Sequence, residues 1–341
     1  MTASTELCLE IGGVSLLIRS DELPLTQMLD WHRPFECSRD DPNVVIEIFG
    51  NGGKRGIIGA TDSPFAAEPF RQYLARQYAR DRRFAGSQAN EDVPAAVLAL
   101  GEQCWTLDSF RESWSRLASD TDRYVMFELF ERSLLFLDRQ QNRASIFVPE
   151  LQALSKFAVS GVLYRHVQLT YALLVSNFGG FVLHAAGVVR GGNGYAFVGP
   201  SGSGKSTLVW SLQGREAILA DDSLVIREMG GAFKAYATPW NMLMGSWTSS
   251  LVEGVREAPL TFVGLIYKGT RGRLEELDAL TGTSMLLANV LPMLYRFDVP
   301  SSQRVLEMAA RLCERIPCYR LGLVRGGDVW SLIDGHGELV H

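Results

Sequence analysis

The segment that most constrains this chain is Gly199-Pro200-Ser201-Gly202-Ser203-Gly204-Lys205-Ser206. It sets two glycines, a lysine and a hydroxyl at the spacing GxxxxGK[ST]. Glycines let the backbone curl until its N–H groups point at phosphate oxygens, lysine adds positive charge, and the hydroxyl suits Mg²⁺. An apolar strand is predicted before the loop, and a helix that begins at Thr207 adds its positive N-terminal end. The sequence therefore predicts that residues 199–207 bind a nucleoside triphosphate.

Two adjacent carboxylates, Asp221 and Asp222, follow a short apolar strand predicted at residues 217–220. One carboxylate at such a strand end commonly organises Mg²⁺, here together with Ser206. The second is able to accept a proton from a hydroxyl nucleophile, but both reach one site only if the chain turns there. Two interpretations stay open: Asp221 binds metal while Asp222 is a base, or Asp222 merely caps a turn.

A histidine lies on the strand predicted before the loop strand. His184 falls within the apolar run 181–189, which a glycine-rich turn at 191–194 connects to the strand 195–198. The two strands most simply form an antiparallel pair. On spacing alone, His184 reads as a buried structural group rather than an active-site group.

The organisation of the chain suggests two domains. Residues 1–150 are rich in predicted strands, such as 8–11 and 14–19 around Gly12-Gly13, and form a smaller α+β domain. Residues 151–341 are expected to form an α/β domain that opens with a helix at 154–176, which buries His166 and ends at Gly179-Gly180. The other predicted elements are a surface helix or loop at 69–83, strands at 44–49, 124–130, 133–137, 223–227, 233–237, 261–267, 318–324 and 329–333, and helices at 285–291 and 302–315.

Composition excludes several classes of protein. The net charge is −5 and no long basic run occurs, so a nucleic-acid partner is not expected. The most apolar stretch, 157–189, is interrupted by polar residues, so no membrane span is expected. Five scattered cysteines without a CxxC pair, and the lack of a signal-like N-terminus, indicate reduced thiols in a cytoplasmic protein.

The segment Leu183–Ile226, with a histidine strand, a hairpin, the phosphate loop, a helix and an Asp-Asp pair, resembles the catalytic domain of bacterial HPr kinase/phosphorylase. The resemblance implies a P-loop fold related to phosphoenolpyruvate carboxykinase, with ATP and Mg²⁺ as cofactors. By this resemblance, Asp222 is the proton acceptor and donor, Lys205 binds phosphate, Ser206 binds the metal, and His184 lies near the transferred phosphate. An arginine used later in the family has its candidates in Arg271 and Arg273, of which Arg271 is the one we assign.

The same comparison shows where the chain departs from the family. The Glu-Ile-Arg-Gly-Leu-Gly-like run of HPr kinases is replaced by residues 238–247, so its metal-binding glutamate has no equivalent here. We therefore expect an HPr-kinase-related kinase that phosphorylates a serine-type hydroxyl of a protein or peptide, as kinases of lasso-peptide pathways do. Two alternatives stay open: a nucleotide-binding regulator or scaffold without phosphoryl transfer, and a small-molecule hydroxyl kinase. The resemblance also implies a homo-oligomer, and domain 1–150 is expected to recognise the acceptor.

Overall fold

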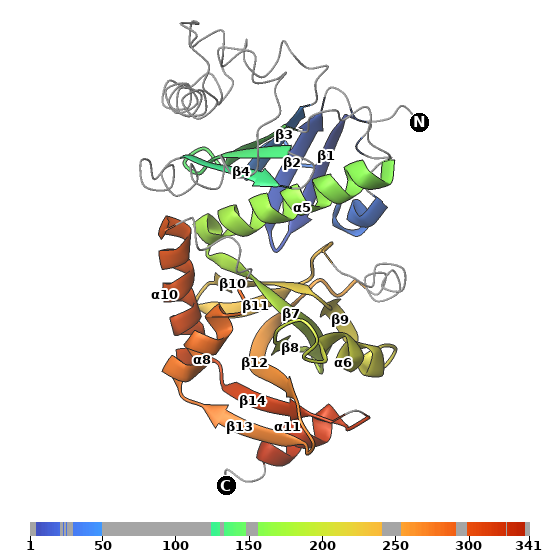
Figure 1. Ribbon diagram of the computed structural model, residues 1–341, viewed down its shortest axis with the longest axis vertical. Helices are drawn as coiled ribbons and strands as arrows, with labels where there is room; N and C mark the ends of the chain where they lie inside the picture. Colours follow the sequence, from blue (N-terminus) through green and yellow to red (C-terminus); the bar gives the residue numbers. More distant parts are fainter. Residues whose placement is uncertain are drawn as a thin grey trace, which may run out of the picture. The chain divides into compact units, whose positions relative to one another are not determined.

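The computed structural model describes residues 5–20, 23, 25, 30–49, 124–129, 133–147, 156–240, 254–290, 299–324 and 326–337. These residues form a mixed α/β protein with two sheets and five α-helices in the described part (Figure 1). The predicted element at 69–83, Cys104 and most of the segment 238–247 lie outside the described residues.

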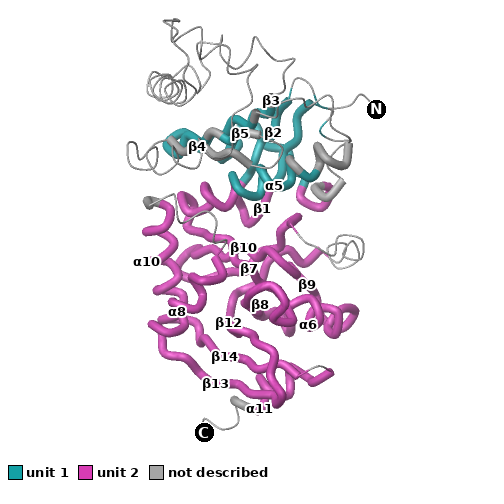
Figure 2. The backbone as a smooth tube through the Cα atoms, viewed as in Figure 1, with its two compact units in different colours: residues 1–9, 15–30, 36–170 teal, residues 10–14, 31–35, 171–341 magenta. Residues whose placement is uncertain are grey.

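The chain divides into two compact units (Figure 2). One unit comprises residues 1–9, 15–30 and 36–170, and the other comprises 10–14, 31–35 and 171–341. The second unit therefore includes two short pieces from the beginning of the chain.

The first unit is built on a six-stranded sheet with the order β1-β2-β3-β6-β5-β4. Its strands are β1 (Glu6–Ile11), β2 (Val14–Ser20), β3 (Val44–Phe49), β4 (Tyr124–Leu129), β5 (Ser133–Asp138) and β6 (Arg143–Phe147). The predicted hairpin is present: β1 and β2 are neighbours, and Gly12 and Gly13 make the turn at φ 57° and 72°, which glycine adopts without strain. The strand-rich character expected of this part of the chain is confirmed for the described residues.

Helix α5 (Lys156–Leu174) follows, as the helical spacing of its apolar residues predicts. It buries Leu163, His166 and Val167, so the prediction of a core histidine is confirmed. A 3₁₀ turn, η6 (Val175–Phe178), continues the helix, and Gly179 ends it in the left-handed conformation with φ 70°.

The second unit holds an eight-stranded sheet with the order β11-β10-β7-β8-β12-β14-β13, and β9 also pairs with β7. Its strands are β7 (Gly180–Arg190), β8 (Asn193–Val198), β9 (Ala217–Ala220), β10 (Ser223–Met229), β11 (Ala232–Tyr236), β12 (Glu257–Lys268), β13 (Arg273–Leu277) and β14 (Cys318–Leu323). The predicted antiparallel pairing of β7 with β8 is confirmed. Strands β8, β12 and β14 run parallel, so their carboxyl ends share one edge of the sheet.

Helices cover the two faces of this sheet differently (Figure 1). Helix α6 (Lys205–Leu212) and helix α11 (Val329–Gly337) pack against Ala186, Phe197, Ile266 and Leu321 in one apolar cluster. Because side chains alternate along a strand, the neighbours of those residues point to the other face. Helix α8 (Ala279–Leu287) lies on that other face, where a Cβ on Gly282 would come within 3.1 Å of the Cβ of Cys318, and it packs beside α10 (Val299–Arg315).

Two sequence predictions in this unit are corrected. Residues 329–333, predicted as a strand, begin helix α11, because Asp328 accepts a hydrogen bond from the backbone N–H of Trp330 and another from the Ser331 hydroxyl. The helix predicted at 285–291 starts earlier, at Ala279, where Asp278 caps it by accepting from the N–H of Thr281. In both places an aspartate cap determines where the helix begins, whereas the spacing of the apolar residues alone does not distinguish a helix from a strand.

Candidate functional site

The glycine-rich loop connects β8 to α6, and its backbone follows from its glycines. Gly202 and Gly204 have φ of 81° and 112°, which side chains with a Cβ rarely adopt. A Cβ on Gly199 would lie 2.7 Å from Oγ of Ser203 and 2.9 Å from the carbonyl oxygen of Ile266. The three glycines therefore allow a tight curl that places the start of α6 at the carboxyl end of β8.

Ser203 is enclosed by this curl. Its side chain is buried, and its Oγ has no hydrogen-bond partner among the described residues. A buried hydroxyl without a partner is costly unless a ligand or water supplies one. The loop thus presents an unmatched polar atom where the motif predicts phosphate.

Lys205 is folded back onto the loop. Its Nζ donates hydrogen bonds to the carbonyl oxygens of Gly199 at 2.6 Å and Pro200 at 3.2 Å, and only 5% of the residue is exposed. Burial lowers the pKa of Lys205, while the nearby charges of Asp222 and Asp221 act in the opposite direction. The ammonium group is therefore poorly solvated and positioned to gain from an added negative charge.

The histidine and the Asp-Asp pair meet on neighbouring strands. The chain turns at Asp221 and Asp222 between β9 and β10, and Ser223 is paired with His184 in the antiparallel register of β10 and β7. The Nε2 of His184 lies 3.1 Å from Oδ1 of Asp222, and the backbone N–H of Ala185 donates to the Asp222 carbonyl oxygen. The structure thus brings together two side chains that the sequence placed well apart.

The two carboxylates differ in their surroundings. Asp221 is buried at 1% exposure, whereas 34% of the Asp222 side chain and 26% of the His184 side chain are exposed. Consecutive residues at this turn therefore offer one enclosed carboxylate and one that an incoming molecule can reach.

Three further residues predicted from the sequence are exposed. Ser206 and Thr207, in the first turn of α6, are exposed, so their hydroxyls are accessible beside the loop. Arg271 is exposed, in the connection between β12 and β13. Its neighbour Arg273 forms an ion pair with Glu275, at 3.4 Å between Nη2 and Oε2.

One neighbour of the cluster was not predicted from the sequence. The carbonyl oxygen of Asn289, at the end of α8, accepts a hydrogen bond of 2.8 Å from the backbone N–H of His184. The next residue, Val290, forms an isolated bridge with Leu183. No local pattern signals this contact, because it joins segments far apart in the chain.

Within the described ranges, two kinds of feature were sought: a metal-binding group and a membrane-spanning helix. These ranges contain no group of three or more His, Cys, Asp or Glu side chains able to hold a metal ion. They also contain no helix that is both long and apolar enough to cross a membrane.

Comparison with known protein families identifies a similarity that includes the site. The family described as SynChlorMet cassette protein ScmC matches residues 160–336, slightly more than half of the chain. That match covers the loop, the histidine strand and the Asp-Asp pair together. No curated protein matches the chain.

Proposed function

This chain belongs to the SynChlorMet cassette protein ScmC family, and we propose that it is an ATP-dependent kinase that phosphorylates a serine-type hydroxyl of a protein or peptide. One observation carries the proposal. A glycine-rich loop of the phosphate-binding type and a solvent-accessible His184–Asp222 pair occur at the same edge of one sheet.

The triphosphate would occupy the loop between β8 and α6. Backbone N–H groups and the N-terminal end of α6 favour an anion there, and the Ser203 hydroxyl gains the partner it lacks. Lys205 would exchange the carbonyl oxygens of Gly199 and Pro200 for phosphate oxygens. The negative charge offsets the cost of burying its ammonium group, so binding and charge stabilisation use the same side chain.

Asp222 would act as the base. It takes the proton of the acceptor hydroxyl, whose oxygen forms a bond to the γ-phosphorus as the bond to the β–γ bridging oxygen breaks, leaving ADP. His184, 3.1 Å from Oδ1, holds this carboxylate in one orientation. Positioning of this kind supplies most of the rate gain in phosphoryl transfer.

Ser206 and Asp221 would hold the Mg²⁺ that accompanies ATP. Both offer oxygen atoms, the donors that this hard cation prefers, and Mg²⁺ sites built on phosphates need only one or two protein carboxylates. When bound, the ion neutralises charge on the phosphate oxygens. The burial of Asp221 beside Lys205 suits a carboxylate that serves the ion rather than the acceptor.

The remaining parts of the proposal follow from the resemblance to HPr kinases. We infer a catalytic fold of the HPr kinase and phosphoenolpyruvate carboxykinase type in residues 151–341, and a homo-oligomer. Residues 1–150 would recognise the acceptor, and the reaction would take place in the cytoplasm, where ATP is abundant. The peptide acceptor and the arginine role of Arg271 belong to the same proposal.

A second function, a nucleotide-binding regulator without phosphoryl transfer, is favoured by one feature. The glutamate-bearing run of HPr kinases has no counterpart at residues 238–247, which leaves the metal site with fewer carboxylates. A small-molecule hydroxyl acceptor would use the same chemistry as the peptide.

The variant Asp222→Asn tests the proposal. It keeps the shape of the side chain but removes the base, so we expect phosphoryl transfer to fall by about 10²–10⁴-fold while the Kd for ATP stays within about twofold. The matched control is Asp40→Asn, an exposed carboxylate in the first unit. Transfer by Asp222→Asn at the wild-type rate would rule out the assigned base, and ATP binding without transfer by the wild type would favour the regulator.

A further inference from the structure

A cavity lies beside the loop, at the carboxyl edge of the parallel strands β8 and β12. Its volume is about 400 Å³, and its walls are residues 199–203, the ends of β8 and β12, the middle of β14, the last turn of α8 and the residue Asn289 after that helix. This volume is within the range of small-molecule sites, roughly 300–1,000 Å³. The carboxyl edge of parallel strands is also where ligands bind in open α/β sheets.

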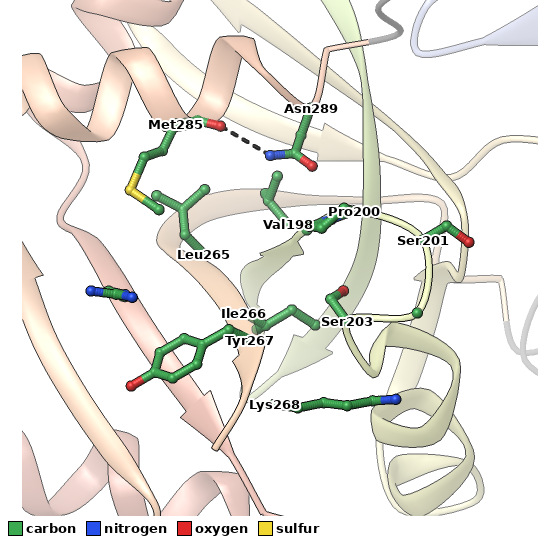
Figure 3. Close-up of a pocket in the computed structure, with 13 residues that line it drawn as sticks. Val198, Pro200, Ser201, Ser203, Leu265, Ile266, Tyr267, Lys268, Met285 and Asn289 are labelled. Carbon is green, nitrogen blue, oxygen red and sulfur yellow. Dashed lines mark hydrogen bonds between the residues drawn. The ribbon is translucent and has the colours of Figure 1, made fainter.

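Strand alternation determines which side chains line the cavity. Phe197, Ile266 and Leu321 point towards α6, so Val198, Leu265, Tyr267 and Arg320 point the opposite way and contribute to its wall. Met285, in the last turn of α8, and Asn289, in the turn that follows the helix, complete it. Figure 3 shows Met285 and Leu265 directed towards each other, with the Asn289 amide above Val198.

The wall has three kinds of chemistry. Val198, Leu265 and Met285 are apolar, whereas Asn289 supplies an amide whose Nδ2 donates 3.0 Å to the Met285 carbonyl oxygen. That bond fixes the amide plane and leaves its oxygen directed away from Met285 (Figure 3). The third element is a stack: the Arg320 guanidinium lies 4.8 Å from the ring centroid of Tyr267.

Charge also distinguishes this cavity. Its described lining includes two cationic side chains, Lys268 and Arg320, and no carboxylate. The lining therefore favours a ligand that is negatively charged or attached to a negative group. The nearest phosphate-binding feature is the loop itself, which forms one wall.

We propose that this cavity binds the base and ribose of the nucleotide whose phosphates occupy the loop. The ligand class is a purine nucleoside triphosphate: the planar base packs among the apolar side chains and the Tyr267–Arg320 stack, and Asn289 hydrogen-bonds its polar edge. The inference rests on the proposed function, because it assumes that the loop holds phosphates.

The acceptor suits this cavity less well than the nucleoside. An acceptor hydroxyl must reach Asp222, which His184 contacts at 3.1 Å. His184 alternates with Ala186 and Val188, which pack against α6, so the reacting pair lies on the α6 face. Leu265 and Arg320 place part of the cavity wall on the α8 face, and the loop forms another part of it, so a nucleotide with its phosphates in the loop is able to reach both the cavity and the pair.

Filling the cavity from α8 tests the proposal. Met285→Trp places an indole ring in the cavity from a half-exposed position. Ser284→Trp is the control, since Ser284 is exposed and does not line the cavity. Calorimetry on the full chain with Mg²⁺ would give Kd values for ATP and for inorganic tripolyphosphate, which has no base. The loss of base stacking predicts that Met285→Trp weakens ATP binding by about tenfold or more.

Comparison of ATP with tripolyphosphate separates the contribution of the base to the binding affinity from that of the phosphates. Met285→Trp should leave tripolyphosphate binding within about twofold of wild type, since a contact to the base alone changes only ATP affinity. An unchanged Kd for ATP, or an equal loss of affinity for both ligands, would overturn the proposal. Because these readouts are binding constants, a lack of phosphoryl transfer would count only against the kinase proposal.

Discussion

At the scale of single residues, the loop contains a glycine with an unusual backbone conformation, Gly204, and a buried lysine, Lys205. Gly204 has φ of 112° directly before Lys205, and Lys205 is buried with a lowered pKa. Burial of the ammonium group costs free energy, whereas glycine adopts this φ without the strain that a Cβ would bring. The local sequence predicts the glycines and the lysine, but the burial of the ammonium group depends on packing that only the folded chain has.

The conformation of Gly204 gives the first prediction. Gly204→Ala forces a left-handed backbone on a residue with a Cβ, so we expect a loss of about 1–2 kcal/mol in the free energy of unfolding and weaker ATP binding. Gly161→Ala is the control, because Gly161 lies within α5 with no atom within 4 Å of the added Cβ. It should stabilise the protein by roughly 0.5–1 kcal/mol, and urea unfolding measures both. Equal changes in the free energy of unfolding for the two substitutions would contradict the strain expected for an alanine at position 204.

The position of His184 gives the second prediction. We expect His184→Ala to reduce kcat by about 10–100-fold, as misplacement of a reacting group does, without changing the Kd for ATP. His184→Asn, which keeps a donor near Asp222, should recover part of that loss. Steady-state kinetics of both variants distinguish positioning from a purely structural role, in which the amide variant would recover nothing.

At the scale of elements, the sequence predicts best where local chemistry and tertiary pairing agree. The β7–β8 hairpin and helix α5 both have a clear period and glycine boundaries. The prediction of a strand at residues 329–333 is wrong, because the apolar residues of this segment fit one face of a helix as well as a buried strand. These residues are Val329, Trp330, Leu332 and Ile333. The hydrogen bond between His184 and Asn289 could not be predicted, because it joins segments far apart in the chain. The cavity could not be predicted either, because it depends on the parallel pairing of β12 with β14, which brings Tyr267 near Arg320.

Tyr171 gives a prediction for helix α5. Its hydroxyl donates 3.0 Å to the carbonyl oxygen of Ile11, and both groups are buried. Tyr171→Phe leaves that carbonyl without its donor, so we expect a loss of about 1–3 kcal/mol at neutral pH. Tyr195→Phe, at a half-buried tyrosine of β8, is the control.

The same side chain sets a pH dependence. Burial raises the pKa of Tyr171 far above its ordinary value, so the folded chain keeps the phenol protonated while the unfolded chain ionises near pH 10. The folded state then binds more protons above pH 10, and the stabilisation is lost as pH rises. The stability gap between wild type and Tyr171→Phe should therefore narrow between pH 9 and about pH 11, measured by urea unfolding. A gap that widens would contradict this sign.

At the scale of the whole molecule, the boundary between the units is not a simple cut in the chain. Residues 10–14 and 31–35 cluster with the second unit, and the buried Arg227 donates from Nη1 to the carbonyl oxygen of Gly12. Arg227 also donates to Phe178, at 3.0 Å from Nε. The second unit thus uses backbone carbonyls that come from the beginning of the chain.

Truncation tests this dependence. Deleting residues 1–150 removes the Gly12 carbonyl that accepts from Arg227 and the Ile11 carbonyl that accepts from Tyr171, so we expect a fragment with a lower urea midpoint than the full chain. Tryptophan fluorescence follows the unfolding of Trp240, which is buried in the second unit. A fragment as stable as the full chain would show that these contacts are dispensable. If it also kept full acceptor affinity, residues 1–150 would have no role in recognition.

Phosphoryl transfer is the central claim, and γ-labelled ATP tests it most directly. Wild type and Asp222→Asn are incubated with cell extract and labelled ATP, and mass spectrometry identifies the labelled products. We predict phosphoserine-type products with the wild-type protein and a loss of about 10²–10⁴-fold with Asp222→Asn. No labelled product with the wild type, or equal labelling by both proteins, would contradict the account.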